Sequence, residues 1–418
     1  MVTRPGLLLA LALLPASLSA SPLWRFCLGS QPCPAGAHRV APGTAYDART
    51  GYGYDLGVAA PGSAPGFYFS ARVPHEGNYD VAVTVGSATH AADTTIKAEL
   101  RRLMALHVRT AAGGSKTVHF IVNVRSPEIA GGGVVRLKPR EKTGEIWDWD
   151  NRITLEFDGP TAAVEAVKIS PAAPMPTVYI AGDSTVCDQP YEPYASWGQM
   201  LTYFFGPGVA IANHAESGES LRSFIGERRL AKLDTLMKPG DYLFIQSGHN
   251  DQKERGPGIG ALTSYKRELE HFVADARAHG VTPVLVTPVS RRTFGPDGRI
   301  VNSLGDFPLA VREVAREQHT ALIDLNAMSE TLYNTLGPAD AVNLFALANG
   351  KREGTHHSDY GAYEIARCIV TGIRENHLPL AAFLKPDAGT FDPRHPDAFA
   401  SFDVPPSPRA AQIKPYGD

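Results

Sequence analysis

Four short polar segments of this chain contain the residue types that acyl transfer requires. They follow strand-like runs and lie at 182–185 (GDST), 213–218 (NHAESG), 248–251 (GHND) and 353–356 (EGTH). A serine hydroxyl becomes a good nucleophile when a histidine accepts its proton, and the histidine needs a carboxylate that fixes its tautomer. The oxyanion that then forms needs N–H donors, which a glycine backbone and an asparagine amide can supply. Together the segments indicate a serine-dependent acyl transfer.

Ser184 is placed by the stretch that precedes it. Residues 178–180 read as a short apolar strand, and this strand ends at Gly182. Ser184 should therefore lie at the carboxyl end of a sheet, where open α/β sheets bind their ligands. The alternative is that Ser184 only caps the next turn or helix. The three other segments favour the catalytic interpretation.

Strand-like and helix-like patterns alternate from residue 177 onward. Strands are predicted at 178–180, 209–211, 242–246, 284–287 and 321–325, and helices at 196–205, 220–236, 262–278 and 309–318. Ser358 is a typical N-cap and predicts the start of a last helix. The alternation predicts a parallel three-layer α/β/α domain over residues 177–384, with the polar segments at one edge of its sheet.

Residues 21–171 have a different pattern, of period two. Runs such as 79–85 and 118–124 alternate apolar and polar side chains, and turn residues separate them. This pattern favours an all-β, antiparallel sandwich ahead of the α/β domain. A Pro-rich linker at 172–176 joins the two, and the tail 385–418 is expected to pack as a loop on the surface.

Two further features of the first half have alternative explanations. Trp147 and Trp149 could stack against sugar, but tryptophan is usually buried, so we expect them in the core. The basic pair Arg101-Arg102 is expected on a solvated face or in local salt bridges.

The four polar segments, in this order, resemble the motif blocks of the SGNH (GDSL) hydrolase superfamily. The neighbouring stretches SWGQML, ESLRSF and LVTPVSRR are similar to its rhamnogalacturonan acetylesterase-like branch of carbohydrate esterases. The resemblance covers roughly residues 176–384 and implies the flavodoxin-like fold of that superfamily. The predicted sandwich is similar to the galactose-binding-like domains that precede some of these esterases.

The resemblance also implies roles for individual residues. Ser184 corresponds to the nucleophile and His356 to the general base. The backbone N–H groups of Ser184 and Gly218 and the side-chain amide of Asn250 correspond to the oxyanion hole. The family pattern places Asp three residues before the histidine, whereas this chain has Glu353 there.

A second carboxylate, Asp359, follows His356 by three residues. An acid in the first turn of a helix is favoured by the helix dipole whatever the active site does, so Asp359 has a structural explanation. Glu353 precedes the helix, in a segment expected to be a loop, and lacks that explanation. We therefore favour Glu353 as the partner of His356, and we expect His357 at the surface beside the site.

On this basis we expect a secreted serine esterase that removes O-acetyl groups from plant cell-wall polysaccharide, with rhamnogalacturonan as its main substrate. The alternatives are acetylxylan as substrate, a lipase- or thioesterase-type member of the superfamily, and a non-catalytic carbohydrate-binding protein. The partner would be an acetylated polysaccharide or oligosaccharide. Metal-ligand spacings such as C-x-x-C and H-E-x-x-H do not occur in the sequence, so we expect no metal, and no organic cofactor is needed.

Composition limits the other partners and the compartment. The formal net charge of −3 implies no strong attraction to nucleic acid. Residues 1–20 read as a signal peptide, because Arg4 precedes a short apolar run at 7–14, and this run is too short to span a membrane. A secreted or periplasmic location without a membrane partner follows, and Cys27 and Cys33 could there form a disulfide. The oligomeric state is left open.

Overall fold

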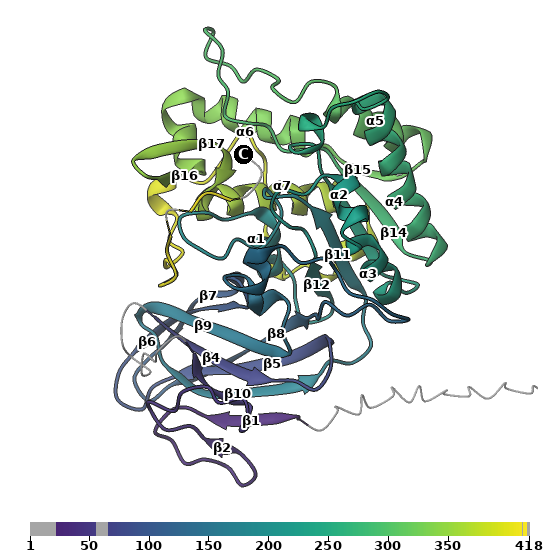
Figure 1. Cartoon of the computed structure of the whole chain (residues 1–418). Helices are drawn as coiled ribbons and strands as arrows, with labels where there is room; N and C mark the ends of the chain where they lie inside the picture. Colours follow the sequence, from purple (N-terminus) through teal and green to yellow (C-terminus); the bar gives the residue numbers. More distant parts are fainter. Residues whose placement is uncertain (1–21, 56–65, 412, 416–418) are drawn as a thin grey trace, which may run out of the picture.

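The computed structural model describes residues 22–55, 66–411 and 413–415. The predicted signal peptide, residues 1–20, lies outside the described residues. A β-sandwich is followed by an α/β domain, and the two lie directly against each other (Figure 1). The last strand of the sandwich ends at Pro171 and the first strand of the α/β domain begins at Thr177.

Two five-stranded sheets pack face to face in the first half of the chain. Their strand orders are β2-β1-β10-β5-β8 and β3-β4-β9-β6-β7, and every neighbouring pair is antiparallel except the short pair β1–β2. The strands are β1 (Trp24–Cys27), β2 (His38–Arg39), β3 (Tyr52–Asp55), β4 (Gly66–Arg72), β5 (Gly77–Gly86), β6 (Ala92–Ala98), β7 (Arg102–Thr110), β8 (Ser115–Val124), β9 (Arg152–Thr161) and β10 (Val164–Pro171). The predicted all-β sandwich is confirmed.

The core of the sandwich follows the alternation seen in the sequence. Tyr79, Val81, Val83 and Val85 of β5 are buried, while the residues between them are half-buried. Successive side chains of a strand point to opposite faces, so this one run contributes four side chains to a single core. Strands β6 and β7 were not predicted, and they form the edge that faces the α/β domain (Figure 1).

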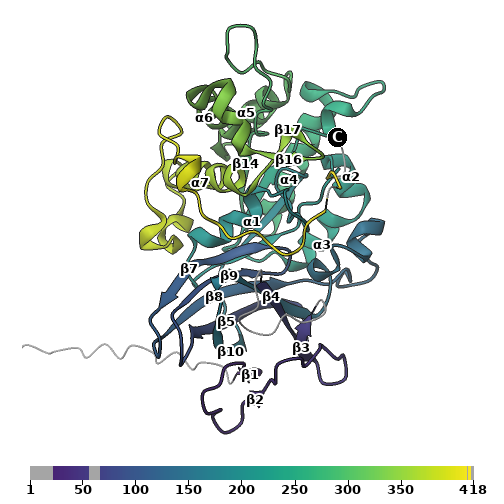
Figure 2. The same cartoon turned by 90° about the vertical axis from the view of Figure 1, so that its left-hand side faces the viewer.

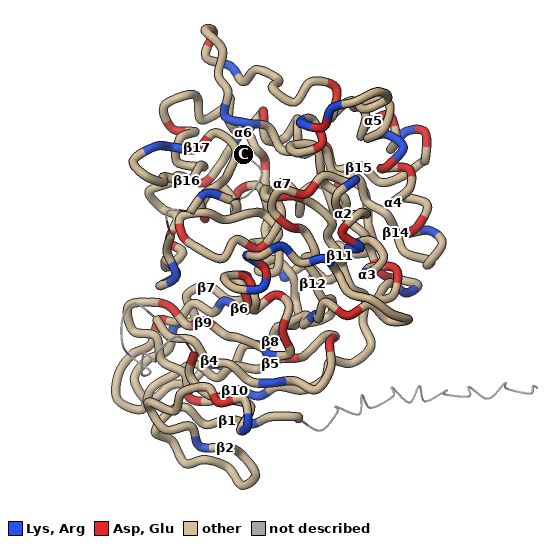
Figure 3. The backbone as a smooth tube through the Cα atoms, viewed as in Figure 1, with Lys and Arg blue, Asp and Glu red and all other residues tan. Residues whose placement is uncertain are grey.

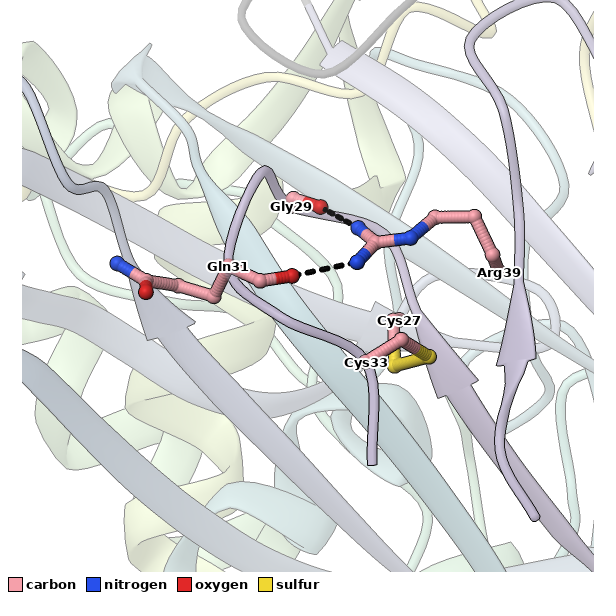
Figure 4. Close-up of a disulfide and its surroundings, with 5 residues drawn as sticks. All are labelled: Cys27, Gly29, Gln31, Cys33 and Arg39. Atoms are coloured by element: carbon pink, nitrogen blue, oxygen red, sulfur yellow. Dashed lines mark hydrogen bonds between the residues drawn. A yellow bond between two sulfur atoms is a disulfide. The ribbon is translucent and has the colours of Figure 1, made fainter. Parts of the chain in front are cut away.

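A disulfide between Cys27 and Cys33 closes the loop after β1 (Figure 4). The guanidinium of Arg39 donates to the carbonyl oxygens of Gly29 and Gln31 in the same loop. The predicted bridge is therefore present, and an arginine from the neighbouring strand β2 fastens the loop that it closes.

A five-stranded, fully parallel sheet forms the centre of the second half. Its order is β12-β11-β13-β14-β15, which is the flavodoxin-like arrangement 2-1-3-4-5. The strands are β11 (Thr177–Gly182), β12 (Ala210–Asn213), β13 (Tyr242–Gln246), β14 (Thr282–Val286) and β15 (Ala321–Ile323). The helices are α1 (Trp197–Leu201), α2 (Leu221–Gly226), α3 (Arg229–Leu236), α4 (Lys266–Ala278), α5 (Phe307–Glu317), α6 (Leu325–Asp340) and α7 (Asp359–Glu375).

Helices cover both faces of this sheet. Val178 and Ile180 of β11 belong to a core shared with α1, α6 and α7, whereas Tyr179 and Ala181 belong to a core shared with α2 to α5. The strand is buried on both sides, which explains why it reads as a continuous apolar run. The predicted three-layer α/β/α domain is confirmed.

Some predicted helix limits are wrong, and some elements were missed. The helix predicted at 220–236 is two helices, because Arg228 between α2 and α3 has a left-handed φ of 66°. Helix α6 was not predicted, nor was the hairpin of β16 (Phe345–Ala348) and β17 (Lys351–His357). The last helix was predicted correctly: Ser358 caps α7 and accepts a hydrogen bond from the Gly361 amide.

The chain after residue 384 runs back across the junction of the two domains (Figure 2). The hydroxyls of Ser407 and Tyr68 lie 3.0 Å apart, and the Arg409 guanidinium lies 4.4 Å from the ring centroid of Trp147. The same guanidinium lies 4.8 Å from the ring centroid of Tyr191, so the tail contacts both halves of the molecule. Trp147 and Trp149 are buried, as predicted.

The junction itself is rich in ion pairs, and blue and red segments mix where the domains meet (Figure 3). Arg102 of β7 donates to Asp188 and Asp148, at 2.6 and 2.8 Å, and is 2% exposed. Arg229 of α3 pairs with Glu141 of the first half at 2.6 Å. Of the two expectations for Arg101-Arg102, the salt bridges are confirmed and the solvated face is wrong, because both side chains are buried. No helix within 22–55, 66–411 and 413–415 is long and apolar enough to cross a bilayer.

Leu103 of β7 tests whether the sandwich contributes a side chain to the hydrophobic core of the α/β domain. It is fully buried and packs in the core cluster of the α/β domain. We expect Leu103→Ala to lower the free energy of unfolding by about 2–5 kcal/mol, as measured by urea titration. Leu309→Ala, at an exposed position of α5, should change it by no more than about 0.5 kcal/mol. An equally small loss at Leu103 would contradict a shared core.

Candidate active site

Ser184 and His356 come from segments 172 residues apart and meet at the carboxyl edge of the parallel sheet. Ser184 lies two residues beyond the end of β11, and His356 lies near the end of β17. The Nε2 atom of His356 is 3.0 Å from the Oγ atom of Ser184, which is hydrogen-bonding distance. Ser184 is 4% exposed and His356 is 1% exposed. The pair has the geometry of an activated serine.

The turn that carries Ser184 is tight and internally bonded. A Cβ atom on Gly182 would lie 2.8 Å from the Gln246 carbonyl oxygen and 2.7 Å from Val186, so only glycine fits there. The Oδ1 atom of Asp183 accepts from the amide and the hydroxyl of Thr185, at 2.9 and 2.7 Å. These contacts fix the backbone on both sides of Ser184.

Asp183 is buried beneath the turn and faces His249 at 3.4 Å. Burial opposes its ionisation, but His249 and the bonds from Thr185 outweigh burial and hold the pKa of Asp183 below its usual value. Asp183 therefore supports the turn as a carboxylate.

Glu353 and Asp359 have different environments. The Oε2 atom of Glu353 lies 3.6 Å from the Nδ1 atom of His356, on the side of the ring away from Ser184. Asp359 instead accepts from the guanidinium of Arg101 at 2.9 Å. Glu353 lies in strand β17 and not in the loop that we expected. Glu353 and His356 thus lie three residues apart in one strand of the hairpin.

His357 is buried, and its expected place at the surface is wrong. Its Nε2 atom lies 2.8 Å from the Tyr333 hydroxyl of the unpredicted helix α6. Burial, reinforced by the nearby His356 and His249, lowers the pKa of His357 to about 3. His357 is thus a neutral packing residue that holds β17 against α6.

The segments that follow β12 and β13 flank the Ser184 turn, because these strands are the two neighbours of β11. Gly218 has a left-handed φ of 82°, which favours glycine. Asn250 donates from Nδ2 to the Glu219 carbonyl at 2.9 Å, so the two segments are bonded to each other. Gly218 and Asn250 therefore lie in linked loops on either side of the serine turn.

Residues of the sandwich half support these loops. Lys138 donates to the Ser217 carbonyl at 2.7 Å, and Arg140 donates to the Glu216 carboxylate at 2.8 and 3.0 Å. Neither residue was predicted to support the site, because both lie outside the segment that resembles a known family. Charge alone would not have distinguished them from surface cations.

A cavity of about 170 Å³ is lined in part by Tyr194 and Gln189, which contact His356 and Ser184, although neither Ser184 nor His356 lines it. The ring of Tyr194, one of its lining residues, packs edge-on against the ring of His356 with centroids 6.0 Å apart. Three parts of the chain line it, and they contribute Arg140, Thr143, Gly144, Glu145, Gln189, Pro190, Tyr191, Tyr194, Ile413, Lys414 and Pro415. The lining mixes charged groups with tyrosine rings.

Glu145 in this lining pairs with Arg140 at 3.0 Å and lies near a second carboxylate, Glu216. Burial, reinforced by the Glu216 carboxylate, raises the pKa of Glu145 to about 9.

Over the described part of the chain, no group of three or more His, Cys, Asp or Glu side chains is placed to hold a metal ion.

Comparison with known proteins gives consistent matches. Residues 180–361 match the model of the GDSL-like lipase/acylhydrolase family. The chain is 41% identical over 214 residues to rhamnogalacturonan acetylesterase RhgT of Bacillus subtilis (strain 168). This alignment covers 49% of the chain and 91% of RhgT. It is 34% identical over 208 residues to the probable rhamnogalacturonan acetylesterase YesY of the same organism, with 49% and 94% covered. The X-ray structure of YxiM from Bacillus subtilis has 25% identity and a TM-score of 0.47, over 85% of this chain and 99% of that one.

Thr185 tests the bonds that hold the serine turn. Its buried hydroxyl donates to Asp183 and accepts from Gln246 Nε2, each at 2.7 Å. Thr185→Val keeps the shape of the side chain but removes the hydrogen bonds to Asp183 and Gln246. The free energy of unfolding should therefore fall by about 1–3 kcal/mol in a urea titration. Thr117→Val, on the exposed face of β8, serves as the control and should change it by about 0.5 kcal/mol or less. Equal effects would show that the turn does not depend on this bond.

Proposed function

Because the chain belongs to the GDSL-like lipase/acylhydrolase family and is a carboxylic ester hydrolase, we propose that it removes O-acetyl groups from plant cell-wall polysaccharide, above all rhamnogalacturonan. The 3.0 Å contact between Ser184 and His356 is the observation that carries this proposal. We choose an acetyl ester of rhamnogalacturonan as the substrate because RhgT is named a rhamnogalacturonan acetylesterase and YesY a probable one.

In the proposed mechanism, Ser184 attacks the acetyl carbonyl carbon while His356 Nε2 accepts the proton of its hydroxyl. The tetrahedral intermediate collapses when the C–O bond to the sugar breaks and His356 returns the proton to the sugar oxygen. Water, deprotonated by His356, then attacks the acetyl-enzyme and releases acetate and free Ser184. Glu353 fixes the tautomer of His356 and stabilises its imidazolium form.

The proposed oxyanion hole consists of the backbone N–H groups of Ser184 and Gly218 and the side-chain amide of Asn250. Asn250 uses one N–H for Glu219, and its amide has a second N–H for the oxyanion. Since the loops are bonded to each other and to Lys138, these donors are held before the charge develops, which is the condition for strong stabilisation.

The lining of the cavity next to Tyr194 suits a sugar better than a long acyl chain. Its lining combines the polar side chains of Arg140, Glu145 and Gln189 with the rings of Tyr191 and Tyr194. Sugars bind through hydrogen bonds and contact with aromatic faces, whereas a lipid chain needs a continuous apolar groove.

We also propose export of the protein, because a disulfide such as Cys27–Cys33 persists in oxidising compartments.

The function is tested by acetate release. Wild-type protein should release acetate from acetylated rhamnogalacturonan faster than from acetylated xylan or mannan, and it should hydrolyse 4-nitrophenyl acetate. Ser184→Ala should abolish both reactions with an unchanged melting temperature, whereas Ser87→Ala, in an exposed loop of the sandwich, should retain them. Normal turnover by a folded Ser184→Ala protein would refute the mechanism, and acetate release from xylan alone would refute the substrate.

Glu353→Gln tests the proposed role of the carboxylate. The change keeps size and hydrogen bonding but removes the charge behind His356, so kcat should fall by up to about 10⁴ with little change in KM. Glu330→Gln, at an exposed position of α6, is the matched control and should leave kcat unchanged. Steady-state kinetics on 4-nitrophenyl acetate decide the question. An unchanged kcat in the Glu353 variant would assign the role to another group.

A further inference from the structure

The turn between β6 and β7 is buried at the boundary with the α/β domain, where it bonds to the loop that follows Ser184 and to α1. It consists of Glu99, Leu100 and Arg101, all at most 2% exposed although they form a hairpin turn. Glu99 and Arg101 have left-handed φ values of 54° and 64°, which are uncommon for such residues. The Leu100 carbonyl accepts from Gln199 of α1 at 2.7 Å. Surface turns are not normally buried in this way.

The Arg101 guanidinium donates to four groups of the α/β domain. Nη1 donates to the backbone carbonyls of Tyr194, at 2.6 Å, and Gln189, at 3.4 Å. Nη2 pairs with the carboxylates of Glu192 and Asp359, at 2.5 and 2.9 Å. Three of these partners lie in the loop that follows Ser184, and the fourth begins helix α7.

The partners of Arg101 are themselves bonded to the reacting residues. The Gln189 side chain donates to the Ser184 carbonyl at 2.8 Å. The Tyr194 ring packs against His356, and the next residue, Ala195, donates from its amide to the His357 carbonyl at 3.0 Å. Arg101 is therefore bonded to elements that carry the serine and to elements that carry the histidine.

We propose that Arg101 is a positioning residue, through which the sandwich holds Ser184 and His356 at their reactive separation. The inference rests on the proposed function of that pair. A single guanidinium can do this because its planar fork donates in several fixed directions, which the flexible ammonium of lysine cannot reproduce. The sandwich is then a structural part of the active site in addition to any role in binding polysaccharide.

A merely structural role is the competing explanation, because loss of a buried cation leaves two carboxylates without their partner and destabilises a protein. The two explanations differ when the charges are removed together. Arg101→Met, Glu192→Gln and Asp359→Asn combined remove the guanidinium together with both carboxylates that it pairs with, yet they do not restore the bonds to the carbonyls of Tyr194 and Gln189. This triple variant separates stability from positioning.

We expect Arg101→Met to lower kcat on 4-nitrophenyl acetate by about 10²-fold, with little change in KM, since small displacements of reacting groups have effects of this size. Arg101→Lys should recover only part of the loss. The triple variant should regain the melting temperature lost in Arg101→Met while kcat stays low. Arg109→Gln, at an exposed arginine of β7, is the control and should match wild type. Recovery of kcat together with stability in the triple variant would overturn the proposal.

Hydrogen exchange tests the proposal without reference to activity. In Arg101→Met, backbone amides of residues 188–195 should exchange faster than in wild type, while those of β13 and β14 should be unchanged. Unchanged exchange in the 188–195 loop would overturn the proposal even if wild type is an active esterase. Absence of any ester turnover by wild type would instead refute the proposed function, and the exchange result would still decide whether Arg101 holds this loop.

Discussion

A charge that is removed from water must be paired, and this constraint joins the two halves of the molecule. Arg101 and Arg102 leave the sandwich and are almost fully buried against carboxylates of the α/β domain or of the junction. Removing one partner of such a set costs several kcal/mol, because the other charge remains buried alone. The relative placement of the halves is thus specified by directional bonds, whereas apolar contact alone would permit sliding.

The same constraint reaches the reacting atoms. Ser184 and His356 lie on segments that share no regular ladder of hydrogen bonds, since β11 belongs to the parallel sheet and β17 to a separate hairpin. Their separation must therefore be set by side-chain bonds and packing around them. Gln189 bonds to the Ser184 carbonyl and Tyr194 packs against His356, and the backbone carbonyls of both accept from Arg101. In this view a residue of the first domain determines distances in the second.

Much of the α/β domain was predictable because local pattern and global fold agree there. Strand β11 is apolar on both faces and ends at Gly182, a position with no room for a side chain. Ser358 is a typical N-cap residue and does cap α7. The pattern failed where burial is polar. Strands β6 and β7 bury Lys97 and Arg102 beneath the tail and the junction, where Lys97 bonds to the Pro405 carbonyl and Arg102 to Asp188, so burial there does not follow apolar character. His357 reads as a surface residue for the same reason, since its partner Tyr333 lies on a helix that the sequence did not reveal.

Family resemblance and physical contact also divide the chain differently. The match to RhgT covers 49% of the chain, and the family model matches residues 180–361, which excludes the sandwich. Yet Lys138 bonds the loop that carries Gly218, and Arg101 bonds the loop that follows Ser184. A Pro-rich linker separates two folding patterns but does not separate their functions, because buried ion pairs act across it. Residues outside a recognised domain can therefore belong to its active site, and only the contacts identify them.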